Sequence, residues 1–249
     1  MIYVLGDLHG ELHRLTANRF PNGVKMTRED YAIVCGDFGG VWDGSPRERK
    51  WLNILEQEPF TTLFIDGNHE NHAMLNALPV SEWNGGKVHE VRPHILHLMR
   101  GQVFRLDGMT FFTMGGAASH DIEDGILDPK ASDYTEQLMY MRYTNAMFRV
   151  LGKSWWPEEM PSDEEYAEAE RNLDKAGWRV DYVLTHCAPT SIVRQLGRQD
   201  EVNRLTDFLQ TVKRRCEFDR WFMGHYHMDT VLDEKFVIQY RQMTELEMQ

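Results

Sequence analysis

The stretch Ile2-Tyr3-Val4-Leu5-Gly6-Asp7-Leu8-His9-Gly10 decides how this chain folds. Its first four residues are apolar or aromatic, which is typical of a short buried strand. Asp7 and His9 follow that strand directly, so two side chains that can bind a metal ion lie where it ends. The sequence therefore predicts a strand over Ile2–Gly6 with a metal-binding loop at its carboxyl end.

The pairing of an apolar run with a metal-binding motif returns further along the chain. The motifs are Gly36-Asp37, Gly67-Asn68-His69-Glu70, Thr185-His186 and Gly224-His225-Tyr226-His227. The apolar runs directly before them are Tyr31 to Cys35, Leu63 to Ile65, Tyr182 to Leu184 and Trp221 to Met223. Strands of one sheet can bring their ends to a common edge, so this pattern predicts one metal site on a rigid scaffold.

Strand and helix patterns alternate in the first third of the chain. We expect strands over Tyr31–Gly36 and Thr61–Asp66, and helices over Glu11–Asn18 and Pro46–Gln57. Strands separated by helical stretches of roughly 10–15 residues indicate βαβ units and a mainly parallel sheet. In such sheets ligands bind outside the carboxyl ends of the strands, which is where the motifs lie.

The middle of the chain has a different pattern. Short β-like runs, the last three separated by Gly101 and Asp107-Gly108, predict a meander in a second sheet: Lys87–Val91, His94–Leu98, Gln102–Leu106 and Met109–Met114. The next segment, 117–160, has no clean strand pattern and carries many large side chains. Because a structureless stretch of that length is uncommon in a compact domain, we expect helices with connecting loops there. We interpret this segment as a lid-like insertion.

Helices and strands alternate again in the last third. Ser162 and Glu165 form a predicted capping box that starts a helix ending near Ala176. The later elements are expected at Val180–Thr185, Glu201–Lys213 (a helix), Arg220–Gly224, Val231 and Phe236–Tyr240. The tail after Gln242 is expected to be loose. Because no repeat or linker interrupts residues 1–249, we interpret them as a single domain that carries the insertion.

Length and charge limit the function. A chain of 249 residues can bury a proper core. Its net charge of −12 argues against binding long nucleic acid, which requires a basic surface. No apolar run reaches the ~18 residues that a membrane span needs, and Met1 leads straight into the first strand. We therefore expect a cytoplasmic protein without membrane contact, and the sequence leaves its oligomeric state open.

The motif residues suit two divalent ions. Imidazole nitrogens combined with carboxylate or carbonyl oxygens bind ions such as Mn, Fe and Zn. Asp7 and His9 can reach the same ion, and Asp37 is the candidate bridge between two ions. The spacing of His225 and His227 leaves open whether they serve one ion or both. The full predicted set is Asp7, His9, Asp37, Asn68, His186, His225 and His227.

Such a pair of ions favours hydrolysis of phosphoesters. Two ions ~3.5–4 Å apart can share a hydroxide and direct it in line at phosphorus. We expect His69 and the bridging Asp37 to be the catalytic residues, with His69 protonating the leaving oxygen as general acid. The alternative for His69 is that it orients Asn68. The ions can be Mn, Fe, Zn, Ni or Mg, and manganese is our first choice.

In order and spacing these motifs resemble those of the calcineurin-like metallophosphoesterases: Asp-x-His, Gly-Asp, Gly-Asn-His-Glu/Asp, a lone His and Gly-His-x-His. The match extends from Asp7 to His227. The resemblance implies a four-layer α-β-β-α sandwich of two mixed β-sheets, with the metal site at the C-terminal ends of strands. It also implies that Asp7, His9, Asp37 and His227 hold the first ion, and that Asp37, Asn68, His186 and His225 hold the second.

The chain departs from the protein Ser/Thr phosphatases of this superfamily. Those enzymes carry Gly-Asp-x-x-Asp-Arg-Gly at the second motif and an Arg before Gly-Asn-His-Glu. Here residues 36–42 read GDFGGVW, and Asp66 stands in place of that Arg. Both phosphate-binding arginines are therefore absent, which favours a small phosphodiester or nucleotide-type substrate. The stretches Gly115-Gly116-Ala117 and Ser154–Glu159 resemble a bacterial or phage-type branch of uncharacterised phosphoesterases.

Three further side chains are candidate substrate contacts. His120 follows a glycine pair and can enter the pocket, while Trp42 and Trp156 can stack on a flat substrate group. The alternative for both tryptophans is that they pack the insertion onto the body. Other functions that the sequence leaves open are a Ser/Thr-type protein phosphatase, a nuclease and a non-catalytic metal-binding docking scaffold.

Overall fold

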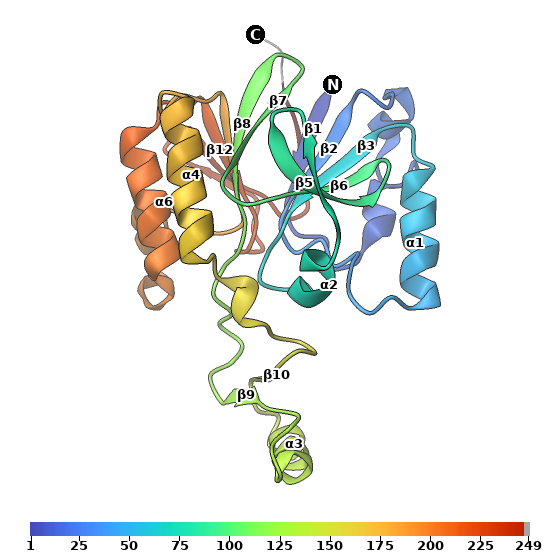
Figure 1. The fold of residues 1–249 in the computed structure, drawn as a ribbon, viewed down its shortest axis with the longest axis vertical. Helices are drawn as coiled ribbons and strands as arrows, with labels where there is room; N and C mark the ends of the chain where they lie inside the picture. Colours follow the sequence, from blue (N-terminus) through green and yellow to red (C-terminus); the bar gives the residue numbers. More distant parts are fainter. Residues whose placement is uncertain (247–249) are drawn as a thin grey trace.

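Two mixed β-sheets form the centre of the computed structural model, which describes residues 1–246. The sheets face each other and helices cover their outer sides, so the body has four layers (Figure 1). This arrangement confirms the predicted α/β fold class. Within residues 1–246, none of the helices combines the length and apolar character needed to cross a membrane.

The first sheet has seven strands in the order β15-β1-β2-β3-β6-β5-β4. Its four parallel strands are β1 (Ile2–Leu5), β2 (Tyr31–Cys35), β3 (Thr61–Ile65) and β6 (Ile95–Leu98). Its antiparallel strands are β15 (Met243–Leu246), β5 (Gly86–Arg92) and β4 (Val80–Trp83). The parallel order places the ends of β1, β2 and β3 side by side.

The second sheet has six strands in the order β13-β14-β12-β11-β8-β7. Its parallel strands are β14 (Phe236–Ile238), β12 (Arg220–Met223), β11 (Tyr182–Thr185) and β8 (Met109–Met114). The edge strands β13 (Thr230–Leu232) and β7 (Gln102–Leu106) are antiparallel to their neighbours. The ends of β11 and β12 therefore also lie next to each other.

The helices and the sheets enclose three apolar layers. Side chains of both sheets, among them Val4, Ile33, Leu184 and Phe222, pack against each other in the middle layer. The outer layers lie under α1 (Pro46–Glu56) on one side and under α4 (Asp163–Lys175) and α6 (Arg204–Arg215) on the other. The shorter helical segments are Leu12–Leu15, Pro21–Lys25, α2 (His72–Asn76), Pro157–Glu159, α5 (Thr190–Gln195) and Gln199–Glu201.

The covering helices begin where their capping residues stand. Ser45 accepts a hydrogen bond from the backbone of Glu48 at the start of α1. Ser162 and Glu165 form the predicted capping box of α4. In α6 the buried Leu205, Leu209 and Val212 follow the helical period, so one face packs on the second sheet.

Residues 117–160 form an arm that projects from the body (Figure 1). A two-stranded parallel ribbon, β9 (Gly125–Leu127) and β10 (Phe148–Val150), leads to helix α3 (Tyr134–Tyr143). No residue of α3 is buried. The expectation of helices with loops is confirmed for α3 but missed the ribbon, because three-residue strands carry too little alternation to be recognised.

Three sequence predictions of elements are wrong. The predicted meander does not lie in one second sheet, because β5 and β6 join the first sheet and only β7 and β8 join the second. The expected helix over Glu11–Asn18 is only a 3-10 turn over Leu12–Leu15, because Glu11 provides no side-chain cap and Thr16 is already extended. The expected loose tail after Gln242 is instead β15, which pairs with β1 and buries Leu246 between the sheets. Residues 247–249 of that tail lie outside the described residues.

Candidate metal centre

The loops after β1, β2, β3, β11 and β12 bring the predicted ligands to one edge of the two sheets. Five of these side chains are almost fully buried: Asp7, Asp37, Asn68, His186 and His225. Burying two carboxylates is costly unless partners of positive charge or hydrogen-bond donors surround them. Asp7 and Asp37 therefore need cations or hydrogen-bond donors close to their carboxylates.

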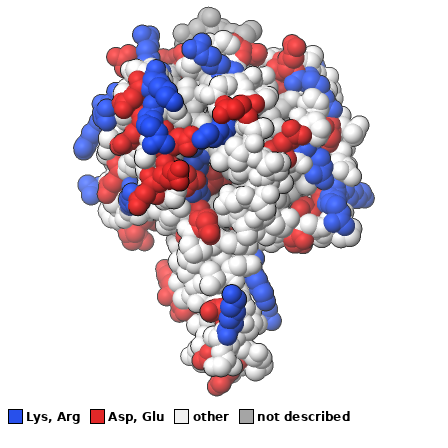
Figure 2. Space-filling view, in the orientation of Figure 1, with Lys and Arg blue, Asp and Glu red and all other residues white. Residues whose placement is uncertain are grey.

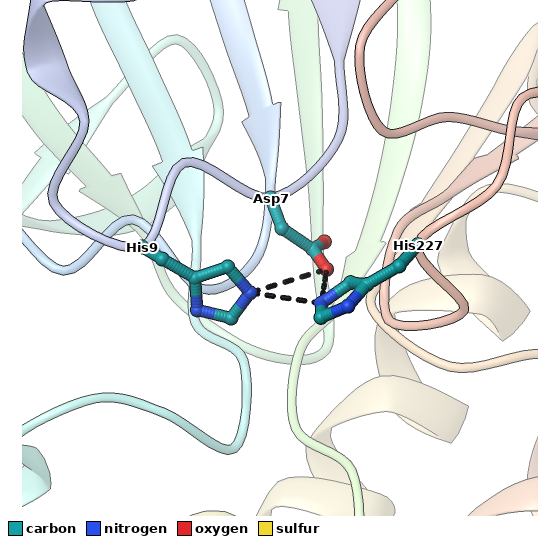
Figure 3. Close-up of side chains that lie close together, drawn as sticks. All are labelled: Asp7, His9 and His227. Carbon is teal, nitrogen blue, oxygen red and sulfur yellow. Dashed lines mark hydrogen bonds and ion pairs between the residues drawn. The ribbon is translucent and has the colours of Figure 1, made fainter.

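Asp7, His9 and His227 point toward one another (Figure 3). The His9 and His227 Nε2 atoms are 2.9 Å apart, and Asp7 Oδ2 lies 3.1 Å from His227 Nε2 and 3.8 Å from His9 Nε2. Ligand atoms that share one octahedral ion at ~2.1 Å lie roughly 3 Å apart. Two facing ring nitrogens also need a proton or a cation between them. Both the distances and the donor types fit a divalent ion.

A second group forms around His186. Its Nδ1 lies 2.8 Å from the carbonyl oxygen of Cys35 and donates to it, so in the neutral ring Nε2 carries the free lone pair. That Nε2 faces Asn68 Oδ1 at 3.1 Å and Asp37 Oδ1 at 3.4 Å. Asn68 Nδ2 donates to Ser119 Oγ at 3.2 Å, which is consistent with its Oδ1 facing His186. A nitrogen lone pair among oxygen acceptors fits a bound cation.

The charge balance supports the same conclusion. Burial lowers the pKa of His186, but the carboxylates of Asp37 and Asp7 outweigh this effect and raise its pKa to about 10. Burial raises the pKa of Asp37, yet the positive charge of His186 opposes this and the pKa ends well below its ordinary value. The carboxylates of Asp37 and Asp7 thus favour positive charge at this position, as the ligands of a cation do.

His225 has a separate environment within the centre. Its backbone N–H donates to Asp7 Oδ1 at 2.9 Å, and its ring centroid is 5.0 Å from that of His186. Its Nε2 lies 3.9 Å from Glu201 Oε2. Burial, and then the charge of His186, lowers the pKa of His225 well below the ordinary value. This environment favours the neutral imidazole, which is the form that binds a metal.

Glycines in the motifs give the ligands room. A Cβ atom on Gly224 would lie 2.0 Å from Asp7 Oδ1, and one on Gly67 would lie 2.0 Å from Asp37 Oδ1. Each glycine therefore makes space for a ligand that comes from a different motif. Substitution of either residue would displace a carboxylate.

Several ligands have an unusual backbone conformation. The φ angles are 47° at His9, 48° at Asp37, 66° at His225 and 50° at His227. The left-handed region is uncommon for residues other than glycine and costs of order 1–3 kcal/mol each. Such strain persists where the surrounding fold imposes it, and it often marks functional sites.

His69 and Glu70 follow Asn68 but serve different contacts. The His69 backbone N–H donates to Asp37 Oδ1 at 2.8 Å, and its ring centroid is 5.5 Å from that of His9. Burial lowers the pKa of His69. Glu70 is fully buried and accepts from the backbone N–H groups of Phe38 at 2.6 Å and Gly39 at 3.2 Å. Glu70 thus stabilises the loop that carries Asp37.

A cavity of about 650 Å³ opens over this centre. His9, Asp37, His69, His225 and His227 line its floor. Its walls include Trp42, Arg47 and Trp51 near α1, and His120, Asp121 and Arg149 from the arm. Of the predicted substrate contacts, Trp42 and His120 line the cavity. Trp156 does not: it is buried, and its ring meets that of Trp42 edge to face at 5.7 Å.

Comparison with known proteins places this chain in a family. The family model of the calcineurin-like phosphoesterases matches residues 1–229. The chain belongs to the calcineurin-like phosphoesterases. This family hydrolyses phosphoesters and generally uses a pair of divalent metal ions, so membership confirms the predicted family and general class of enzyme.

Lariat debranching enzymes are among the calcineurin-like relatives. The chain is 26% identical over 159 residues to lariat debranching enzyme A of Xenopus laevis, covering 57% of this chain and 28% of that protein. It is 24% identical to the enzyme of Drosophila melanogaster over 91% of this chain and 42% of the relative. It is 28% identical to the enzyme of Danio rerio over 50% of this chain and 23% of the relative. Each match thus spans less than half of the relative's length.

Proposed function

We propose that the chain hydrolyses small phosphodiesters, including nucleotide-type esters, with two divalent ions. The observation that carries this proposal is the position of Asp37 between the two ligand groups. Its Oδ2 lies 3.7 Å from His9 Nδ1, and its Oδ1 lies 3.4 Å from His186 Nε2. One carboxylate therefore lies beside a histidine ring of each group, which supports Asp37 as the candidate bridge between two ions.

Each ion has its own set of residues in this proposal. Asp7, His9, Asp37 and His227 would hold the first, and Asp37, Asn68, His186 and His225 the second. When bound, such ions supply positive charge beside the phosphate and water acidified to near neutrality. Manganese is the ion with which reconstitution would begin, since mixed imidazole and carboxylate ligands suit it among others.

The protein's own residues would orient the ester and move one proton. A ring nitrogen of His69 protonates the leaving oxygen, while the hydrogen bond from its backbone to Asp37 keeps the ring beside both ligand groups. The cavity is lined by Trp42 from the segment before α1 and by His120 from the arm. Both would contact the rest of the substrate.

The size of the cavity and the charge of the surface favour a small substrate. About 650 Å³ is within the range of small-molecule sites. Figure 2 shows acidic and basic side chains interspersed over the body, and no continuous basic stripe crosses this face. Together with the net charge of −12, this argues against long nucleic acid.

Cleavage at a branch in nucleic acid is the second candidate function. The names of the lariat debranching relatives favour it. The chain matches less than half of each relative, so the activity of those enzymes must be tested on this chain directly. A short branched oligonucleotide is the appropriate test substrate. Turnover of that substrate in preference to small diesters would establish the second candidate.

Substitution of the ligands tests the proposal. Asp37→Asn and His186→Ala should each abolish manganese-dependent hydrolysis of bis-p-nitrophenyl phosphate. His94→Ala is the matched control, because His94 precedes β6 at the opposite end of the sheet. Full activity in purified, folded Asp37→Asn or His186→Ala protein would refute the proposal. Two bound ions without turnover of any ester would instead favour the docking scaffold.

A further inference from the structure

The cavity is lined by positively charged side chains that do not come from the loops after the strands. Both arginines that bind phosphate in the protein Ser/Thr phosphatases are missing from the motifs of this chain. Among the residues that line the cavity, Arg47 and Arg149 carry a permanent positive charge. Arg47 is exposed at the start of α1, whereas Arg149 is partly buried on the wall formed by the arm.

The backbone of the arm fixes the position of Arg149. The residue lies in β10 and pairs with Ile126 of β9. On either side of it, the Met147 N–H donates to Asp124 Oδ2 at 2.7 Å, and the Val150 N–H donates to Ser154 Oγ at 2.9 Å. Arg149 therefore extends from a hydrogen-bonded ribbon, which positions a side chain better than a loop does.

The guanidinium of Arg149 retains unused donors. It forms an ion pair with Asp121 through Nη2, and within residues 1–246 it makes no other hydrogen bond. The second oxygen of Asp121, Oδ1, is buried and has no partner among the described residues. A guanidinium has five N–H donors, so most of them remain free to bind an anion.

A structural arginine of the same chain looks different. Arg100 contacts Asp66 through both Nε and Nη2 and also donates to the carbonyl oxygen of Glu158. Its side chain is only 5% exposed, against 27% for Arg149. Arg100 is thus saturated inside the protein, whereas Arg149 faces the same cavity as His69 and His120.

We propose that Arg149 binds the phosphate of the substrate and replaces, from the arm, the cations that the strand loops lack. The inference rests on the proposed function for its substrate class, a phosphoester anion. Arginine suits this role because its planar fork can donate two parallel hydrogen bonds to phosphate oxygens.

Two measurements on the manganese-loaded protein test the role of Arg149. Arg149→Ala should lower kcat/KM for bis-p-nitrophenyl phosphate about 10- to 100-fold, mainly through KM, as expected for loss of a charged hydrogen bond. It should also weaken binding of inorganic phosphate, measured by calorimetry, by about tenfold or more. Arg149→Lys should recover part of both losses, because it keeps the charge but not the fork.

Arg142→Ala is the matched control, since Arg142 is an exposed arginine of the same arm that does not line the cavity. Metal content and thermal unfolding should be unchanged in all three variants. Added guanidinium ion should partly restore Arg149→Ala, which a purely structural role would not predict.

The inference and the proposed function can fail separately. If Arg149→Ala binds phosphate as tightly as the wild type, or if the wild type binds none, the inference is overturned. If the wild type hydrolyses no ester but binds phosphate in an Arg149-dependent way, the inference stands and the proposed function fails.

Discussion

Gly224 shows how single residues shape the proposed centre. It precedes His225, and a Cβ atom there would overlap Asp7 Oδ1 at 2.0 Å. Asp7 also accepts the His225 backbone N–H at 2.9 Å, so the two motifs lock each other in place. A side chain at this position must therefore move Asp7, a proposed ligand of the first ion.

Gly224→Ala should weaken metal binding at least about tenfold, because misplaced ligands cost metal affinity. Gly152→Ala is the control for replacing a glycine as such: its φ of +67° disfavours alanine, a strain that Gly224 does not have, but no atom lies within 4 Å of its Cβ position. The control should lose about 1 kcal/mol of stability while keeping its metal. Metal content after dialysis against a weak chelator distinguishes the two, and equal content would contradict this account of Gly224.

His69 is expected to act as a proton donor, and the choice of leaving group tests this. His69→Asn should lower kcat about 100-fold or more for an alkyl ester, whose leaving oxygen must be protonated. The effect should be much smaller for a p-nitrophenyl ester, whose leaving group departs readily as an anion. If both substrates lose the same factor, His69 instead orients Asn68. Metal content serves as the control in both cases.

Helices and strands can be predicted from the sequence only where their own residues carry a clear pattern. The strands that precede the metal motifs are apolar throughout, so their positions and their common edge followed from the sequence. Arg149 could not be assigned, because the ribbon of β9 and β10 is set by pairing between segments about 20 residues apart. Strand β15 was missed for a related reason: Met243–Leu246 gains its order from pairing with β1.

One contact across β1 and β15 predicts a dependence of stability on pH. The Tyr3 hydroxyl donates to Glu245 Oε2 at 2.6 Å. Burial, and then this hydrogen bond, raises the pKa of Tyr3 to about 12. The stabilisation is therefore complete below the unfolded pKa near 10 and is lost as pH rises toward 12.

Urea unfolding between pH 8 and pH 11 can measure this effect. The wild type should lose more free energy of unfolding over this range than Tyr3→Phe does. At pH 8, Tyr3→Phe should be less stable by about 1 kcal/mol, the usual value of one hydrogen bond. Tyr143→Phe on the exposed face of α3 is the control and should follow the wild type. Parallel wild-type and Tyr3→Phe curves would show that β15 is not held in this way.

In the whole molecule, the body and the arm contribute different residues to the proposed site. All seven predicted ligands lie in the body, while the arm contributes His120, Asp121 and Arg149 to the cavity wall. Helix α3 at the tip of the arm buries no side chain. Binding of metal and binding of substrate should therefore be separable.

Replacing residues 122–153 by a short glycine–serine linker tests this separation. The shortened protein should fold and bind manganese as the full chain does, because a surface loop tolerates such changes at low entropic cost. Its kcat/KM for phosphodiesters should fall at least about tenfold, since Arg149 is removed. Wild-type turnover in the folded, shortened protein would contradict a role of the arm in substrate binding.

We propose that two divalent ions at this edge of the sheets support the hydrolysis of phosphodiesters. The most direct measurement is the rate of bis-p-nitrophenyl phosphate hydrolysis against that of p-nitrophenyl phosphate, with manganese added and with a chelator. We expect manganese-dependent turnover that favours the diester and disappears with the chelator. Turnover of the monoester alone, or of neither ester by protein that holds two ions, would contradict this proposal.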